Sequence, residues 1–217
     1  MEKIFDLFYN LYMKKFLTLL LFLFLSVNTA FSFALKRTPD KFVQAEQYQV
    51  ITNQANVLYA SNDIKGAFNL FLSIPEDERS PQNWLLMGNI LQDQGKLDEA
   101  KFMYNRAIHS DENFYKAYYN LGNIYLQDNK PNMAIEQYKK VIKIKPEYAY
   151  AHYNLACAYI KLGKLGKAKF ELLTAIDLKN NVADFHYNLA YVYKQLNKEK
   201  TAKTYLEYYN KLKENEI

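Results

Sequence analysis

Alanine returns along this chain at a nearly constant interval. Ala67, Ala100, Ala134, Ala168 and Ala202 are separated by 33, 34, 34 and 34 residues. Four positions after each alanine stands a large apolar residue, and twelve positions before it stands a small one. A long-period repeat of this kind predicts a stack of similar units, because one such unit cannot bury its apolar face without a neighbour. Periodicity is thus the strongest constraint on what this chain folds into.

Each repeated unit has the pattern of two helices joined by a short turn. Within residues 149–182, the apolar residues Leu155, Tyr159 and Leu162 follow one another at i, i+4 and i+7, and a second apolar set follows the turn KLGKLGK. No segment shows the sustained alternation of a strand. All five prolines stand at predicted helix ends or in connections, so none interrupts a helix. These observations predict an all-α architecture.

The repeated positions resemble those of the tetratricopeptide repeat, a helix–turn–helix unit of 34 residues. In residues 81–114 its pattern is matched by Trp84 and Gly88 on the first helix and by Ala100 and Tyr104 on the second. The resemblance implies an all-α fold, a right-handed α-solenoid of about five stacked units. We expect the repeat domain to span residues 48–216, as a degenerate unit 48–80 and the units 81–114, 115–148, 149–182 and 183–216.

Residues 13–34, MKKFLTLLLFLFLSVNTAFSFA, have the pattern of a bacterial secretory signal. Lys14 and Lys15 form a positive start, an apolar core follows, and a more polar stretch ends at Ala34 with a small-x-small cleavage pattern. The pattern fits best if translation begins at Met13, which is a hypothesis of its own. The N-terminal segment is thus predicted to direct export.

The export signal divides the N-terminal region into two expected parts. We expect residues 1–34 to be a signal peptide and residues 35–47 to be a linker and helix lead-in. The alternative is an uncleaved membrane anchor, because residues 16–34 carry no charge and are long enough to span a bilayer. Both outcomes predict that the repeats are extracytoplasmic, either periplasmic or secreted, or held at the inner membrane by the anchor.

Charge and cysteine content argue against several classes of function. The net charge is +5, and basic and acidic residues alternate without a basic block, so nucleic acid is not an expected partner. The single cysteine, Cys157, excludes an intramolecular disulfide. No nucleophile–base set, phosphate loop or dinucleotide fingerprint is present, so we expect no enzyme activity, no cofactor and no metal. His152 and His186 occupy the slot of Trp84 and are expected to be packing residues with one ring nitrogen in water.

The resemblance also implies a binding groove, because the first helix of each unit lines the concave face in this family. Tyrosine and asparagine recur there at two adjacent positions. An asparagine amide matches a peptide group whatever its side chains, so these rows predict a site that holds an extended peptide by its backbone. The alternative is that the asparagines bond neighbouring helices while the tyrosines pack between units. The predicted binding residues are Asn89, Lys116, Tyr119, Asn120, Asn123, Tyr150, Tyr153, Asn154, Tyr187, Asn188 and Tyr191.

These observations predict a non-catalytic protein-interaction scaffold of the bacterial cell envelope, which binds a protein or an extended peptide in its groove. The alternative is a membrane-anchored or self-associating structural scaffold that contacts partners through its ends and its convex face. The membrane is a partner only if the N-terminal segment stays uncleaved. A homo-oligomer would form through the last unit, where Leu206, Tyr209 and Leu212 are expected to be partly exposed.

Overall fold

The computed structural model describes residues 41–214, and all regular structure in this range is helical. The residues predicted as a signal peptide, 1–34, lie outside the described range. None of the described helices is long and apolar enough to cross a membrane. The elements are α2 (Lys41–Ala60), α3 (Ile64–Ser73), the 3-10 helix η1 (Glu76–Glu78), α4 (Pro81–Asp93), α5 (Leu97–Ser110), α6 (Tyr115–Gln127), α7 (Pro131–Ile144), α8 (Ala149–Lys161), α9 (Leu165–Leu178), α10 (Ala183–Gln195) and α11 (Glu199–Glu214).

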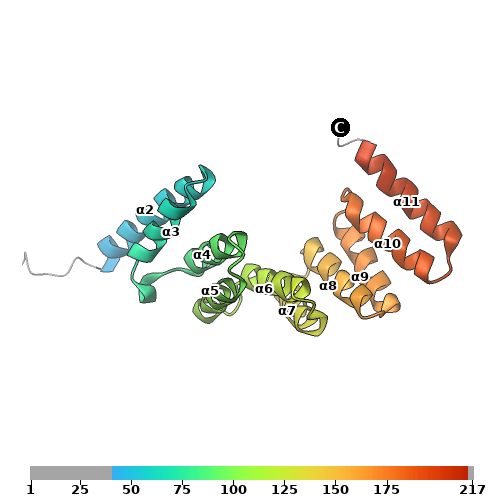
Figure 1. Ribbon diagram of the computed structural model, residues 1–217, viewed down its shortest axis with the longest axis horizontal. Coiled ribbons are helices and arrows are strands. Elements are labelled where there is room, and N and C mark those ends of the chain that lie inside the picture. Colours follow the sequence, from blue (N-terminus) through green and yellow to red (C-terminus); the bar gives the residue numbers. More distant parts are fainter. Residues whose placement is uncertain (1–40, 215–217) are drawn as a thin grey trace, which may run out of the picture. The chain divides into compact units, whose positions relative to one another are not determined.

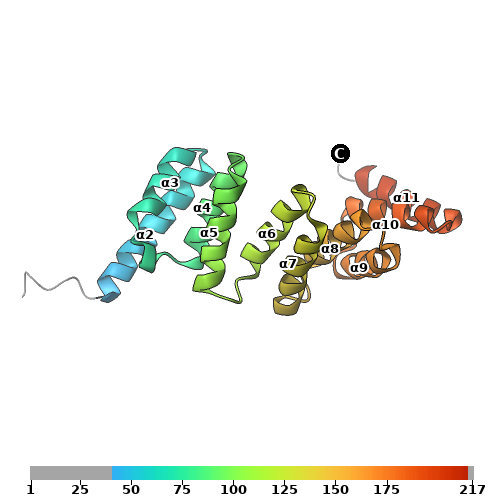
Figure 2. The ribbon, with the colours of Figure 1, turned by 60° about the horizontal axis from the view of Figure 1, so that its bottom comes forward.

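The chain divides into two units between Val50 and Ile51. Helix α2 begins at Lys41, inside the expected lead-in 35–47, and continues into the second unit. From Ile51 onward α2 lies beside α3 (Figures 1 and 2). Ala55 of α2 is fully buried in the same core cluster as residues of α3 and α4.

The rest of the second unit is a series of helical hairpins. Helices α4 and α5, α6 and α7, α8 and α9, and α10 and α11 form the pairs, and the second helix of each pair packs against the first helix of the next (Figure 1). We call α4, α6, α8 and α10 the A helices and their partners the B helices. The predicted all-α solenoid of helix–turn–helix units is confirmed.

Close contact between the two helices of a hairpin depends on the small residues of the A helices. Gly88 lies against the ring of Tyr104, and Gly122 lies against the ring of Tyr138. Both rings are fully buried. A Cβ atom on Gly122 would stand 2.6 Å from Cε1 of Tyr138, which is too near for any real Cβ contact. The glycine therefore gives the tyrosine ring the space it occupies.

Helix α4 begins at a strong start signal that also ties it to α2. Ser80 is the N-cap and Pro81 follows it inside the first turn. The Ser80 hydroxyl accepts from the Asn83 N–H, and the Asn83 side chain accepts from the Ser80 N–H at 2.8 Å. Asn83 Nδ2 also donates to Thr52 Oγ1 at 2.9 Å in a buried position. One asparagine thus completes a capping box and joins two hairpins.

Candidate binding face

The A helices are joined side to side by their asparagine amides. Nδ2 of Asn120 on α6 donates to Oδ1 of Asn89 on α4 at 2.8 Å. One hairpin later, Asn154 Nδ2 donates to Asn123 Oδ1 at the same distance. These bonds orient each amide plane and therefore hold Oδ1 of the donor asparagine in a defined direction. We call the surface formed by these residues and the tyrosines beside them the ladder face.

The third step of the ladder replaces an amide acceptor with sulfur. Asn188 Nδ2 donates to Cys157 Sγ at 3.3 Å, where the two earlier steps use asparagine oxygens. Burial raises the pKa of the Cys157 thiol to about 11. The thiol is therefore protonated at neutral pH, which makes it a poor nucleophile. Cys157 is a half-buried part of the packing between α8 and α10.

Tyrosine hydroxyls take part in the same network from both sides. Asn154 Nδ2 donates to the Tyr119 hydroxyl at 3.1 Å, and Asn188 Nδ2 donates to the Tyr153 hydroxyl at 3.0 Å. From the B helix, the Tyr138 hydroxyl donates to Asn123 Oδ1 at 2.8 Å. Burial raises the pKa values of Tyr119 and Tyr153, so their hydroxyls stay neutral. The Nδ2 atoms of the ladder thus serve contacts between helices, as the packing alternative predicts.

The tyrosine rings of the ladder face are wedged between hairpins. The ring of Tyr153 stacks on Phe185 with centroids 4.7 Å apart, and Phe185 is fully buried. Tyr119 meets Tyr148 edge-on at 5.2 Å. Tyr148 was not among the residues predicted from the sequence, because it stands at the N-cap of α8, outside the positions that the repeat pattern assigns to the groove.

The ladder face is more open toward its last hairpin. Tyr187 and Tyr191 on α10 are 51% and 44% exposed, whereas Tyr119 and Tyr153 are half-buried. Lys116 is exposed in the first turn of α6. All eleven predicted binding residues thus lie on A helices. Lys116, Tyr187 and Tyr191 are exposed, and the other eight side chains are half-buried: Asn89, Tyr119, Asn120, Asn123, Tyr150, Tyr153, Asn154 and Asn188.

The two buried histidines differ from expectation, because neither has a ring nitrogen in water. Nδ1 of His152 lies 2.7 Å from Glu171 Oε2, and its Nε2 lies 2.9 Å from the Pro146 carbonyl oxygen. In His186, Nε2 contacts the Asn180 carbonyl oxygen, while Nδ1 is buried without a hydrogen-bond partner. The prediction of one wet nitrogen is wrong because the B helix and the preceding loop close over the ring.

Burial lowers the pKa of His152, but two hydrogen bonds and the charge of Glu171 outweigh it, so the pKa is raised overall. The two ring nitrogens face two acceptors, and only the protonated imidazole can donate to both. When it is protonated, His152 therefore links α8, α9 and the loop before α8 through both ring nitrogens. Within residues 41–214, no group of three or more histidine, cysteine or acidic residues is arranged to hold a metal ion.

The fold and the ladder face define a class of protein: a helical-repeat scaffold for protein interaction. A model described as TPR repeat matches residues 88–129 and 122–163, and one described as tetratricopeptide repeat matches 149–182 and 183–216. These matches run through residues 88–216, more than half of the chain, so the chain belongs to the tetratricopeptide-repeat family.

Solved structures of MamA proteins share this fold. A MamA fragment from Desulfovibrio magneticus RS-1 superposes with a TM-score of 0.69 at 21% identity, over 79% of this chain and 96% of that one. A MamA crystal structure gives 0.68 at 20% identity, over 75% and 95% of the two chains. At this identity the likeness concerns the fold alone. No curated protein matches the sequence.

Proposed function

We propose that the chain is an extracytoplasmic scaffold of the cell envelope that binds an extended segment of a partner protein along the ladder face. The observation that carries this proposal is the row of asparagines at one position of α6, α8 and α10. Their Nδ2 atoms are engaged by neighbouring A helices, which leaves Oδ1 of Asn154 and Asn188 as the amide atom for a ligand N–H. Acceptors already held in place bind without the entropic cost of ordering them.

The repetition of the same amide at each hairpin suits a ligand that is read through its backbone. An extended chain presents peptide N–H groups at regular intervals, and each asparagine offers the same acceptor at each hairpin. Tyr187, Tyr191 and Lys116 supply the exposed side chains of the face and would contact ligand side chains. Backbone recognition predicts affinity for many sequences in an extended conformation.

The pattern of an export signal in residues 13–34 supports a location outside the cytoplasm. A fusion of the full chain to a phosphatase that is active only after export tests it. Activity is expected for the fusion, and loss of the charged and apolar residues of the signal should abolish it. An inactive wild-type fusion would contradict the location while leaving the binding proposal intact.

The binding test uses short unstructured peptides selected by display against the full chain. We expect Asn154→Ala to weaken the selected peptides about tenfold, the effect of losing one hydrogen bond in a desolvated site. N-methylation of the peptide backbone should weaken wild-type binding to a similar extent, because it removes the donor N–H. Asn105→Ala is the matched control, since that asparagine is exposed on α5 and bonds only its own helix.

Circular dichroism and the midpoint of chemical denaturation show whether Asn154→Ala keeps its fold. Binding that is unchanged in a folded Asn154→Ala protein, together with indifference to N-methylation, would show that the ladder face is not the site. Loss of binding in Asn105→Ala as well would point to a general effect on the fold.

A further inference from the structure

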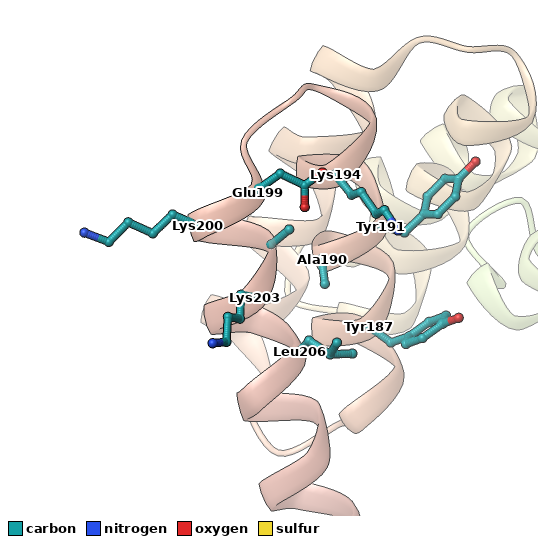
Figure 3. A pocket seen from close by; sticks show the side chains of 9 residues that line it. Tyr187, Ala190, Tyr191, Lys194, Glu199, Lys200, Lys203 and Leu206 are labelled. Carbon is teal, nitrogen blue, oxygen red and sulfur yellow. The ribbon is translucent and has the colours of Figure 1, made fainter.

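A hollow of about 660 Å³ lies between α10 and α11, in the last hairpin (Figure 3). Ala190 and Leu206 form its floor, and Tyr187 and Tyr191 stand along one side (Figure 3); Ala202 also lines it. Leu206 is 41% exposed. Apolar side chains gathered in a concave surface of this size are typical of a binding site rather than of a bare surface.

The equivalent surface one hairpin earlier shows which kind of element packs against it. Counted back by 34 residues, Leu206 corresponds to Leu172 and Tyr187 corresponds to Tyr153. Leu172 is fully buried, in one core cluster with Leu189 and Val192 of the following A helix. The hollow is therefore the seat of an A-type helix, which α10 fills for the hairpin α8–α9.

Helix α10 also shows which residues an occupant of the seat needs. On α10, Phe185 stacks on Tyr153, Asn188 Nδ2 donates to the Tyr153 hydroxyl, and Leu189 and Val192 enter the core. These residues follow at i, i+3, i+4 and i+7, one face of a helix. Tyr187 offers the same ring and hydroxyl to a helix in the hollow, although Tyr209 already contacts its ring at 5.2 Å. The occupant is therefore an amphipathic helix.

The rim of the hollow is positively charged. Lys194 projects from α10, and Lys200 and Lys203 project from α11 beside it, against the single acid Glu199 (Figure 3). Lysines placed around an apolar floor favour acidic residues at the border of the bound helix, where they are partly desolvated. The apolar floor accepts many amphipathic helices, whereas the basic rim favours those with acidic flanks.

The first helix of a second copy fits the seat less well. Gln54 of α2 stands at the position that Leu189 holds in α10, and it is exposed. The same position holds Leu121 in α6 and Leu155 in α8, each 2% exposed. A glutamine in the core of the seat would lose its hydration without gaining a partner. Gln54 is therefore better placed in water than in the hollow of a second copy, which argues against end-to-end stacking of two chains.

We propose that the hollow between α10 and α11 binds one acid-flanked amphipathic helix of a partner protein. The helix packs as the A helix of a further repeat, with an aromatic residue at i, asparagine at i+3 and aliphatic residues at i+4 and i+7. This surface adjoins the ladder face at Tyr187 and Tyr191 but uses α11, which the ladder does not. The chain would hold two segments of a partner: one extended and one helical.

The test measures fluorescence anisotropy of a labelled helical peptide with the full chain. One peptide carries the four contact residues of α10 and glutamates outside them, and a second carries lysines in place of the glutamates. We expect the glutamate peptide to bind about tenfold more tightly than the lysine peptide. The double variant Lys200→Glu with Lys203→Glu should reverse this order, and Leu206→Glu should abolish binding of both.

Two controls separate the seat from other surfaces. Lys139→Glu with Lys140→Glu makes the same charge change at exposed positions of α7 and should leave both affinities unchanged. Asn154→Ala should leave helix binding unchanged, so that failure of the ladder proposal and failure of this one are distinguishable. Circular dichroism confirms that each variant is folded.

Three results would overturn the proposal. In the first, neither peptide binds the wild-type chain. In the second, both peptides bind equally and the rim variants change nothing, which refutes an acidic partner. In the third, sedimentation shows oligomers of the wild-type chain that Leu206→Glu dissociates, which assigns the seat to a second copy.

Discussion

At the scale of single residues, the side chains that face each other where the two helices of a hairpin cross are matched in size. Gly122 faces Tyr138, and sixteen residues separate them. The equivalent pair one hairpin later is Ala156 and Leu172, in which a methyl group and a smaller side chain share the space. Because all four residues are buried where two helices cross, a change in the size of one member should require a change in the other.

The size match predicts a coupled effect on stability. Gly122→Ala should lower the free energy of unfolding by about 1–3 kcal/mol, because the new methyl group meets the Tyr138 ring. Tyr138→Leu in the same chain should restore part of this loss, so that the double variant is less destabilised than the sum of the single ones. Chemical denaturation of the four proteins measures the coupling.

The matched control for this cycle is Gly166→Ala. No atom lies within 4 Å of a Cβ built on Gly166 in α9, so this alanine should be neutral or stabilising by up to about 1 kcal/mol. Strict additivity of Gly122→Ala and Tyr138→Leu would contradict the steric account.

The His152–Glu171 pair makes stability depend on pH. The folded-state pKa of His152 is raised above 6.5, its ordinary value. The stabilisation is therefore fully present below about pH 6.5 and is lost as pH rises through the folded-state pKa. Glu171→Gln removes the charge, so the difference in unfolding free energy between wild type and variant should shrink between neutral and alkaline pH.

Denaturation midpoints across this pH range measure the effect, with His109→Gln as a control at an exposed histidine. A gap between wild type and Glu171→Gln that widens as the pH rises would refute the assignment of the pair. An unchanged slope in His109→Gln shows that the titrating group is not a surface histidine.

At the scale of elements, one backbone conformation recurs in every hairpin turn of the described range. The positive φ angles are 67° at Asn62, 75° at Gly95, 55° at Asn129, 67° at Gly163 and 56° at Asn197. Only glycine and asparagine occupy this position: glycine has no Cβ to collide with the backbone, and the asparagine side chain can offset the collision by local hydrogen bonding. The two glycines are evident in the sequence, whereas the asparagines show their role only in the structure.

The turn before α11 tests this requirement. Asn197→Ala should destabilise the last hairpin by about 1 kcal/mol, because alanine lacks the local hydrogen bonding that makes left-handed backbone accessible to asparagine. Asn197→Gly should be neutral or mildly stabilising. Thermal and chemical denaturation measure the stability of the two variants. Equal stabilities would show that the positive φ at this turn does not affect the stability of the hairpin.

At the scale of the whole repeat array, each hairpin is completed by its neighbours. Leu172 is fully buried because α10 follows it, whereas Leu206 is 41% exposed at the same position of the last hairpin. The prediction that Leu206 is partly exposed is confirmed, and Tyr209 and Leu212 are half-buried. Within residues 41–214, the surface of α10 and α11 around Leu206 is therefore open where the equivalent surface one hairpin earlier is covered, which is the physical basis of the proposed helix site.

The sequence by itself determined the all-α fold, the hairpins and the side of each A helix that carries the binding candidates. Periodicity is enough for these, because the spacing of apolar residues sets which face of a helix is buried. The packing role of Gly88 and Gly122 also followed from the sequence, since a small residue every 34 positions indicates that two helices cross closely there.

Only the tertiary structure decided what each polar group touches. Asn154 could bond a ligand or a helix on sequence grounds, and the structure places its Nδ2 on Asn123 and Tyr119. Glu171 reaches His152 across 19 residues because α9 folds back along α8. Repeat spacing places residues on faces, but partners across hairpins depend on helix offset and rotamer, which packing alone selects.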